Sequence, residues 1–147
     1  MLAQLDMETE AKVAVPLVVD LDGTLIRSDL FVESLFSALG TNPLSAPELL
    51  TAWFRGRAAL KDRAAALGSI DPSRLPYAPA VLDLIGKARA AGRPVYLASA
   101  CSERLVDLVA RHLGLFDGTF ASTPARNLKA AAKADLLVAK FGDKGFD

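Results

Sequence analysis

Short apolar runs alternate with helix-spaced apolar positions along much of this 147-residue chain. The runs at 13–20 (VAVPLVVD) and 94–100 (PVYLASA) are bounded by polar or turn-forming residues, which is typical of buried parallel strands. A third short strand is expected at 118–122. Apolar residues at helical spacing, each set followed by a glycine, predict helices over 80–91, 102–113 and 128–141.

Between the first two strands the apolar pattern is helical. It predicts one helix over 29–39 and a second helical region over 45–67, broken near Gly56. Two large aromatic residues of the second region, Trp53 and Phe54, are expected to pack into the core of this helical stretch.

The pattern therefore divides the chain into two units. Residues 13–25 and 78–147 alternate strand and helix, which predicts an α/β core with a parallel sheet and helices on both faces. Residues 26–77 are expected to be a small helical insertion after the first strand.

The composition excludes several classes of protein. Hydrophobic residues make up 52% of the chain, too many for a disordered protein. Lys plus Arg and Asp plus Glu number 17 each, so no net charge attracts nucleic acid. Neither a secretory leader nor an apolar stretch of membrane-spanning length is evident. With Cys101 as its one cysteine, the chain suits a reducing compartment, and we expect a cytoplasmic location.

Two carboxylates stand at the end of the first predicted strand, in the string VVDLDGTL. Asp20 closes the strand, Asp22 follows two residues later, and Gly23 and Thr24 form the turn. Ligands of an open parallel sheet bind beyond the carboxyl ends of its strands. Two carboxylates this close repel each other unless a divalent cation relieves the repulsion. The arrangement suits phosphoryl transfer, with one carboxylate as nucleophile and the other as proton donor. The alternative is an ordinary Asp-Gly turn.

The second predicted strand ends in a hydroxyl group. Ser99 stands at its tip, and a helix is expected to begin at once, so that backbone N–H groups from about Ala100 to Glu103 face a phosphate. The alternative is that Ser99 is only a cap. Cys101 lies nearby, but the one histidine, His112, lies far along a helix. We therefore expect Cys101 to be a packing residue and not a nucleophile.

The string VVDLDGTL resembles the first motif of phosphatases in the haloacid dehalogenase (HAD) superfamily. The resemblance implies a Rossmann-like HAD fold and an Mg2+-dependent phosphatase. In such an enzyme Asp20 would attack phosphorus and become an aspartyl-phosphate, while Asp22 would protonate the leaving group and then activate water. The resemblance also assigns Mg2+ to Asp20 and to Asp22, the latter through its backbone carbonyl, and phosphate binding to Gly23 and Thr24. Dehalogenases of the superfamily lack the second aspartate, so the resemblance favours a phosphatase.

Two later motifs of the family have counterparts here. Ser99 and Ala100 match the strand end that binds the transferring phosphoryl group. Lys129 is the candidate for the family's lysine, which pairs with the nucleophile and the phosphate. Lys133, one helical turn further on, is the alternative.

The family's fourth motif is an acidic pair that follows a further strand and completes the Mg2+ site. We expect that strand and pair to lie beyond the end of this chain. The alternative is that Asp143 and Asp147 supply the pair. In the family the strand lies beside the strand that carries Asp20, so its absence is expected to leave an open edge and to favour a homodimer.

The helical insertion lies where the family places a small cap that selects substrates. Asp29 is the candidate contact for a substrate ammonium group, and the preferred alternative is an acid that stabilises a helix N-terminus. The basic side chains that follow are expected to lie on a solvated helix face, the alternative being contact with an anionic substrate or lipid head groups. These are Arg55, Arg57, Lys61 and Arg63.

Longer stretches, among them LVVDLDGTLIRSDL, FRGRAALK and NLKAAAKADLLVAKFGDKGFD, resemble the N-terminal HAD domain that is fused to UbiA-type membrane prenyltransferases. This closer resemblance implies a phosphorylated small-molecule or lipid-linked substrate, a fused membrane domain, and a place on the cytoplasmic side of a membrane. The expected function is therefore phosphomonoester hydrolysis. Because the acidic pair of the Mg2+ site is expected to lie beyond this chain, we expect weak Mg2+ binding and weak or absent turnover by the chain alone. The alternative is a regulatory or interaction domain attached to a membrane prenyltransferase.

Overall fold

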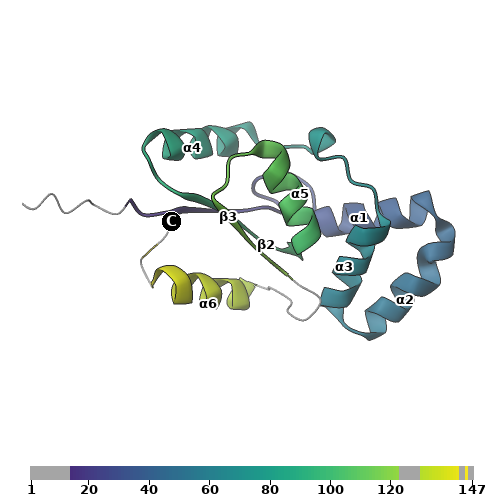
Figure 1. The fold of residues 1–147 in the computed structure, drawn as a ribbon. Helices are drawn as coiled ribbons and strands as arrows, with labels where there is room; N and C mark the ends of the chain where they lie inside the picture. The colour runs from purple at the N-terminus through teal and green to yellow at the C-terminus, as the bar shows by residue number, and fades with distance from the viewer. Residues whose placement is uncertain (1–13, 123–129, 143–144, 146–147) are drawn as a thin grey trace, which may run out of the picture.

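A computed structural model describes residues 14–122, 130–142 and 145. Its centre is a three-stranded parallel sheet in the order β1-β2-β3 (Figure 1). The strands are β1 (Leu17–Asp20), β2 (Val95–Ser102) and β3 (Gly118–Ser122). In the pairing of β1 with β2, Leu17 lies opposite Val95 and Asp20 lies opposite Ala98. The carboxyl ends of the two strands therefore meet at one edge of the sheet.

Helices cover both faces of this sheet, as the sequence predicts. Figure 1 shows α4 (Pro79–Ala90) and α5 (Glu103–Leu113) on one face and α6 (Ala130–Phe141) on the other. Side chains alternate between the two faces along β2. One face of the sheet packs against α5 in the main buried core, which includes Val19, Val95, Leu97, Val106 and Val109.

The opposite face is held by an aromatic cluster. Tyr96 of β2 lies with its ring centroid 5.1 Å from that of Phe141 on α6 and 5.7 Å from that of Phe120 on β3. Leu137, one turn before Phe141, is also buried. These contacts fix α6 against the sheet and set which of its residues face the strands.

The segment between β1 and α4 is helical, as predicted. It contains α1 (Leu30–Thr41), α2 (Ala46–Phe54) and α3 (Arg57–Leu67), with 3-10 turns at Pro43–Ser45 and Pro72–Arg74. The three helices pack on one another through a small cluster of their own, built around Ala38, Leu49 and Ala64. Figure 1 shows α2 at the outer end of this insertion, with α3 between it and the sheet.

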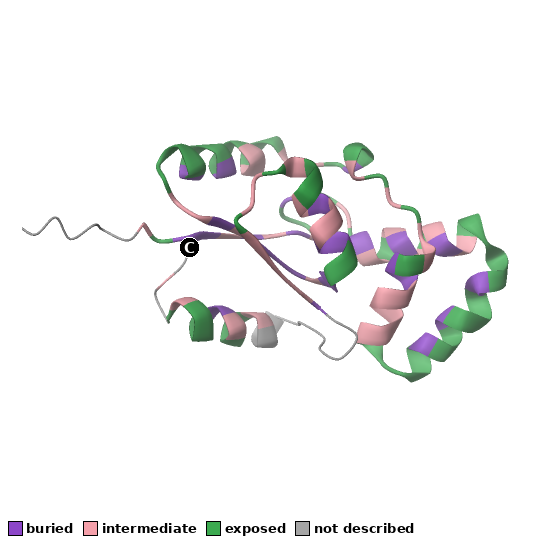
Figure 2. Ribbon diagram, in the orientation of Figure 1, coloured by how far each residue is buried: buried purple, intermediate pink, exposed green. Residues whose placement is uncertain are grey.

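The prediction that Trp53 and Phe54 pack into the insertion core is wrong. Their exposed fractions are 68% and 83%. The helix turns Leu49 and Ala52 inward, and both are buried. Trp53 and Phe54 belong to a different arc of the helix, and both are exposed. Figure 2 shows that most of the α2 ribbon carries the colour of exposed residues. The apolar pattern of α2 extends over more of its surface than the small cluster covers.

No helix in the described part of the chain is both long and apolar enough to cross a bilayer.

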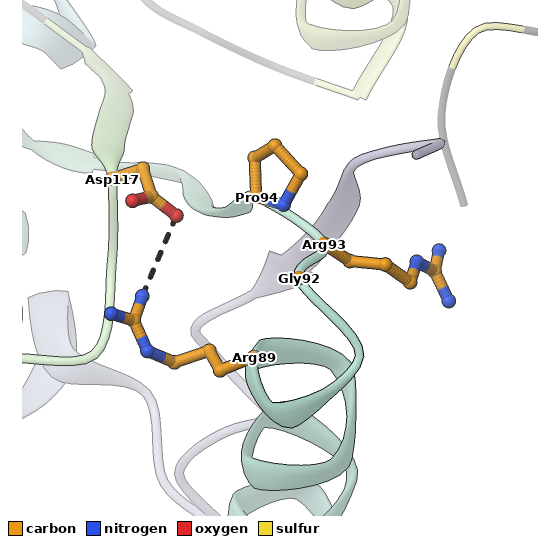
Figure 3. Close-up of a pocket in the computed structure, with 5 residues that line it drawn as sticks. All are labelled: Arg89, Gly92, Arg93, Pro94 and Asp117. Carbon is orange, nitrogen blue, oxygen red and sulfur yellow. Dashed lines mark hydrogen bonds and ion pairs between the residues drawn. The ribbon is translucent and has the colours of Figure 1, made fainter. Parts of the chain in front are cut away.

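A polar cluster closes the amino ends of the strands and lines a shallow pocket (Figure 3). Asp117 accepts a hydrogen bond from the Val95 N–H at 2.7 Å, and its own N–H donates to the Val95 carbonyl at 2.7 Å. Arg89 donates to the Leu115 carbonyl at 2.8 Å and lies 3.5 Å from the Asp117 carboxylate. Because this pocket lies at the opposite edge of the sheet from Asp20, we interpret its groups as structural.

Replacing Asp117 with alanine should destabilise the fold. The Val95 N–H would lose its acceptor in a residue that is 0% exposed, which we expect to cost about 1–2 kcal/mol of unfolding free energy. Urea unfolding followed by circular dichroism measures this. Asp117→Asn keeps an acceptor oxygen and should lose less, and Asp83→Ala, on the exposed side of α4, serves as control. Equal stability of Asp117→Ala and Asp83→Ala would contradict the structural role.

Candidate active site

The turn after β1 presents the first aspartate at the sheet edge. Asp20 is the last residue of β1, and its carbonyl accepts a hydrogen bond from the Leu25 N–H at 3.1 Å. Gly23 adopts a φ of +73°, a left-handed conformation that side chains disfavour. The glycine thus allows the chain to turn back within a few residues. Gly23 and Thr24 are both exposed, and their predicted role in phosphate binding stays a prediction.

A lysine from α6 reaches the predicted nucleophile. Lys133 Nζ lies 2.5 Å from Asp20 Oδ1, across 113 positions of sequence. The Lys133 side chain is 22% exposed and that of Asp20 is 42% exposed, so the pair is open to solvent on one side. Lys133 stands one and two turns before Leu137 and Phe141, and this spacing points it toward the sheet.

In the sequence, Lys133 is the alternative candidate for the family's lysine that pairs with the nucleophile. The preferred candidate, Lys129, lies outside the described residues, so its role stays a prediction. Asp143 and Asp147, the alternative acidic pair, also lie outside them. Lys129 and Lys133 differ by one helical turn, so the sequence pattern had no means of separating them.

Asp22 is part-buried, and two hydrogen bonds hold its carboxyl group in place. Its Oδ1 accepts from the Leu30 N–H at 2.8 Å, and its Oδ2 accepts from Ser99 Oγ at 3.1 Å. Burial raises the pKa of the Asp22 carboxyl, while the two hydrogen bonds lower it and the charges of Asp29 and Asp20 raise it further. A carboxyl with a raised pKa holds a proton more readily, as a general acid requires.

Ser99 is fully buried and holds Asp22 in place. Its Oγ donates to Asp22 and accepts from the Cys101 N–H at 2.9 Å. The prediction that a helix begins directly after Ser99 is wrong, because β2 continues to Ser102 and α5 begins at Glu103. The pairing with β3 shifts register between Ala98 and Ser102, which lets the strand continue past the serine. Binding of a phosphate by Ser99 stays a prediction.

The Ala100 carbonyl joins the helical insertion to the sheet edge. It accepts a hydrogen bond from Lys61 Nζ at 2.6 Å and one from Ser122 Oγ at 2.9 Å. The prediction of a solvated face is wrong for Lys61, whose part-buried ammonium reaches across from α3. Burial lowers the pKa of Lys61, against the opposing influence of Cys101, Asp22 and Asp29. No local pattern identifies this contact, because its partner lies 39 positions away.

The structure also tests the predictions made for Asp29 and Cys101. Asp29 caps α1, since its Oδ1 accepts from the Phe31 N–H at 2.9 Å and the Val32 N–H at 3.2 Å. This confirms the helix-terminus interpretation, and contact with a substrate stays a prediction. Cys101 is buried, and burial raises the pKa of its thiol to about 12. A neutral thiol is a poor nucleophile, which confirms Cys101 as a packing residue.

The residues at this edge fit a magnesium ion in part. Mg2+ is commonly held by one or two carboxylates together with water and substrate phosphate, and the half-exposed Asp20 carboxylate offers such a ligand. The Asp22 side chain is engaged by Leu30 and Ser99, which leaves its backbone carbonyl as the group that the family resemblance assigns. Within the described ranges, no three His, Cys, Asp or Glu side chains gather to form a closed metal site.

Comparisons with known proteins agree with this architecture. The family model described as haloacid dehalogenase-like hydrolase matches residues 35–140. A curated relative, the uncharacterized protein y4nM of Sinorhizobium fredii (strain NBRC 101917 / NGR234), is 44% identical over 126 residues. That match covers 86% of this chain and 24% of the relative, so the chain spans about a quarter of the relative's length.

Among solved structures, the chain is similar to the HAD family hydrolase t0658 from Salmonella enterica subsp. enterica serovar Typhi. The TM-score is 0.54 at 19% identity, over 90% of this chain and 54% of that one. It is also similar to a phosphoserine phosphohydrolase-like protein from Francisella tularensis subsp. tularensis SCHU S4, with a TM-score of 0.46 at 18% identity, over 72% and 57% of the two chains. The first likeness shows the shared fold. With the family model matching most of its length, the chain belongs to the haloacid dehalogenase-like hydrolase family.

Proposed function

We propose that this chain is an Mg2+-dependent phosphomonoester hydrolase domain that works through an aspartyl-phosphate on Asp20. The observation that carries the proposal is the ion pair between Lys133 Nζ and Asp20 Oδ1 at 2.5 Å. It places a fixed positive charge beside a half-exposed carboxylate at the carboxyl edge of a parallel sheet, where an incoming phosphate would need both groups.

In the first half of the proposed reaction an Asp20 carboxylate oxygen attacks phosphorus. A bond forms between that oxygen and phosphorus, and the bond from phosphorus to the ester oxygen breaks. The Asp22 carboxyl gives its proton to the departing ester oxygen, which leaves as an alcohol. The raised pKa of Asp22 supports this role, because burial favours its protonated form.

In the second half Asp22, now a carboxylate, takes a proton from a water molecule. The water oxygen attacks phosphorus, the bond to Asp20 breaks, and inorganic phosphate leaves. Both carboxyl groups then have their starting protonation. Ser99 and the Leu30 N–H keep the Asp22 carboxyl in one orientation for both transfers.

Positive charge near the phosphate would come from the chain and from a metal. When bound, Mg2+ supplies charge that offsets the phosphate oxygens. Lys133 holds one Asp20 oxygen and would contact the phosphate on the same side. Lys61 extends from the insertion to the Ala100 carbonyl, directly after Ser99 in the chain. This contact supports a further part of the proposal, that residues 26–77 act as a cap over the site.

The proposed substrate is a phosphorylated small molecule or a lipid-linked phosphate. The match to this chain covers 24% of the curated relative. This supports the proposal that such a domain works within a longer protein, as it would in a fusion to a UbiA-type membrane prenyltransferase. A regulatory or interaction domain of such a fusion is the alternative function. The part-buried, hydrogen-bonded Asp22 favours the enzyme, because a carboxyl group whose pKa is raised by its surroundings is typical of a catalytic site.

Asp20→Asn should abolish Mg2+-dependent hydrolysis of p-nitrophenyl phosphate. The amide is a far weaker nucleophile, so we expect kcat to fall by at least about a thousandfold. Asp83→Asn, a matched change on the exposed side of α4, should keep full activity. Turnover by Asp20→Asn at the unchanged rate would contradict the proposal. Complete inactivity with Mg2+ toward a broad panel of phosphate esters, in a protein extended beyond Asp147 to include the family's fourth motif, would favour the regulatory alternative.

Lys133→Met should lower kcat by about a hundredfold, because the charge that faces the nucleophile and the developing phosphate charge is lost. Steady-state kinetics with the same ester measures this. Lys87→Met, on the exposed side of α4, is the control and should leave kcat unchanged. Equal kcat values for the two lysine variants would show that Lys133 does not act on the reacting groups.

Asp22→Asn should lose activity and change how stability depends on pH. A carboxyl whose pKa is raised in the folded protein keeps its proton there while the unfolded chain has lost it. Stability of the unchanged protein therefore falls as pH rises from the ordinary value of 3.8 through the raised folded value. The asparagine variant lacks this fall, so its stability relative to the unchanged protein should increase across that range.

Urea unfolding at a series of pH values measures the relative stability of the Asp22→Asn protein. Asp83→Asn, treated in the same way, corrects for the loss of a surface charge. A stability difference that stays flat or decreases with rising pH would show that burial of Asp22 does not raise its pKa.

A further inference from the structure

The outer face of the helical insertion carries large apolar side chains that nothing in the described structure covers. On α2 they are Leu50, Trp53 and Phe54, with exposed fractions of 55%, 68% and 83%. They stand at i, i+3 and i+4, so they form one continuous stripe along the helix. Leu44, in the turn that leads into α2, is 86% exposed. We call these four side chains the α2 face.

Single exposed apolar residues are common on folded proteins, whereas an exposed stripe of leucine, tryptophan and phenylalanine marks a binding surface. The end of α2 and the start of α3 add charge. Arg55 and Arg57 follow the stripe directly, are exposed, and form no ion pair with another described residue. Residues 44–63 hold four Lys or Arg and two Asp or Glu, in a chain whose net charge is zero. Positive charge is therefore concentrated beside the apolar stripe.

Tryptophan and phenylalanine flanked by arginine are suited to the boundary between lipid headgroups and acyl chains. The aromatic rings enter the boundary, and the guanidinium groups meet the phosphates. We propose that the α2 face docks the protein on an anionic phospholipid bilayer. The proposal concerns a surface outside the candidate active site and does not depend on the chemistry of Asp20.

Charge also favours an anionic bilayer over a second copy of the chain as the binding partner of the α2 face. A two-fold symmetric dimer through the α2 face would place the same patch of each copy against the other. Arg55 and Arg57 of both copies would then be brought together, where like charges repel. An anionic bilayer accepts the same arginines favourably.

The protein carries its own reporter for this docking, because Trp53 is its one tryptophan. The unchanged protein is titrated with vesicles of phosphatidylcholine alone and with vesicles that also contain phosphatidylglycerol. Vesicles with phosphatidylglycerol should shift Trp53 emission to the blue and protect it from a water-soluble quencher. Added salt should weaken the effect, because it screens the arginines. Phosphatidylcholine alone should have little effect.

Two paired variants test the two parts of the surface. Leu50→Ser with Phe54→Ser keeps the reporter and should reduce the partition constant about tenfold or more. Arg55→Gln with Arg57→Gln should reduce it by a similar factor, for anionic vesicles only. Leu84→Ser with Lys87→Gln is the matched control on α4, where Leu84 is 51% exposed, and should bind as the unchanged protein does.

Three outcomes would overturn the proposal. One is Trp53 emission that no vesicle changes. Another is partitioning that the α4 variant weakens as much as the α2 variants do. The third comes from light scattering without vesicles: the mass of the unchanged protein rises with its concentration, whereas the Leu50→Ser, Phe54→Ser protein stays a monomer. That result would assign the α2 face to a second copy of the chain.

Discussion

The part-buried carboxyl group of Asp22 is the constraint around which this site is arranged. It accepts one hydrogen bond from the first turn of α1 and one from Ser99 on β2, so a single side chain joins the loop after β1, the sheet and the start of the insertion. Burying a carboxyl group opposes its ionisation, and the arrangement is stable only because both oxygens have donors. The partial burial that disfavours the charged form of Asp22 also raises its pKa, which is the property that acid catalysis needs.

Asp20, two residues earlier, has the opposite environment. It is half exposed and lies against the ammonium of Lys133, which α6 brings from the other face of the sheet. That approach depends on the aromatic packing of Phe141 on Tyr96, because it orients the helix. One carboxyl group is thus part-buried and held by two hydrogen bonds, and the other is half exposed and paired with a cation. Contrasting environments of this kind separate a proton donor from a nucleophile in neighbouring residues of the same type.

The local parts of this account could be predicted from the sequence. Asp20, Asp22 and Gly23 follow an apolar strand at fixed spacing, and their positions depend on a turn that a few residues determine. Contacts between distant segments could not be predicted, because Lys61 and Lys133 look like any other helical lysine until tertiary packing directs them. The error at Trp53 and Phe54 has a related cause: apolar spacing identifies a helix but does not say how much of its apolar surface a neighbour covers.

The central claim is that Asp20 becomes covalently phosphorylated. The most direct measurement is to quench the protein during turnover of a phosphate ester with Mg2+, reduce the acyl phosphate with borohydride, and locate the reduced residue by peptide mass spectrometry. The account predicts that position 20 carries the modification, and that Asp22→Asn changes its amount but not its place. Turnover without modification at position 20, or with modification at another carboxyl group, would contradict the account.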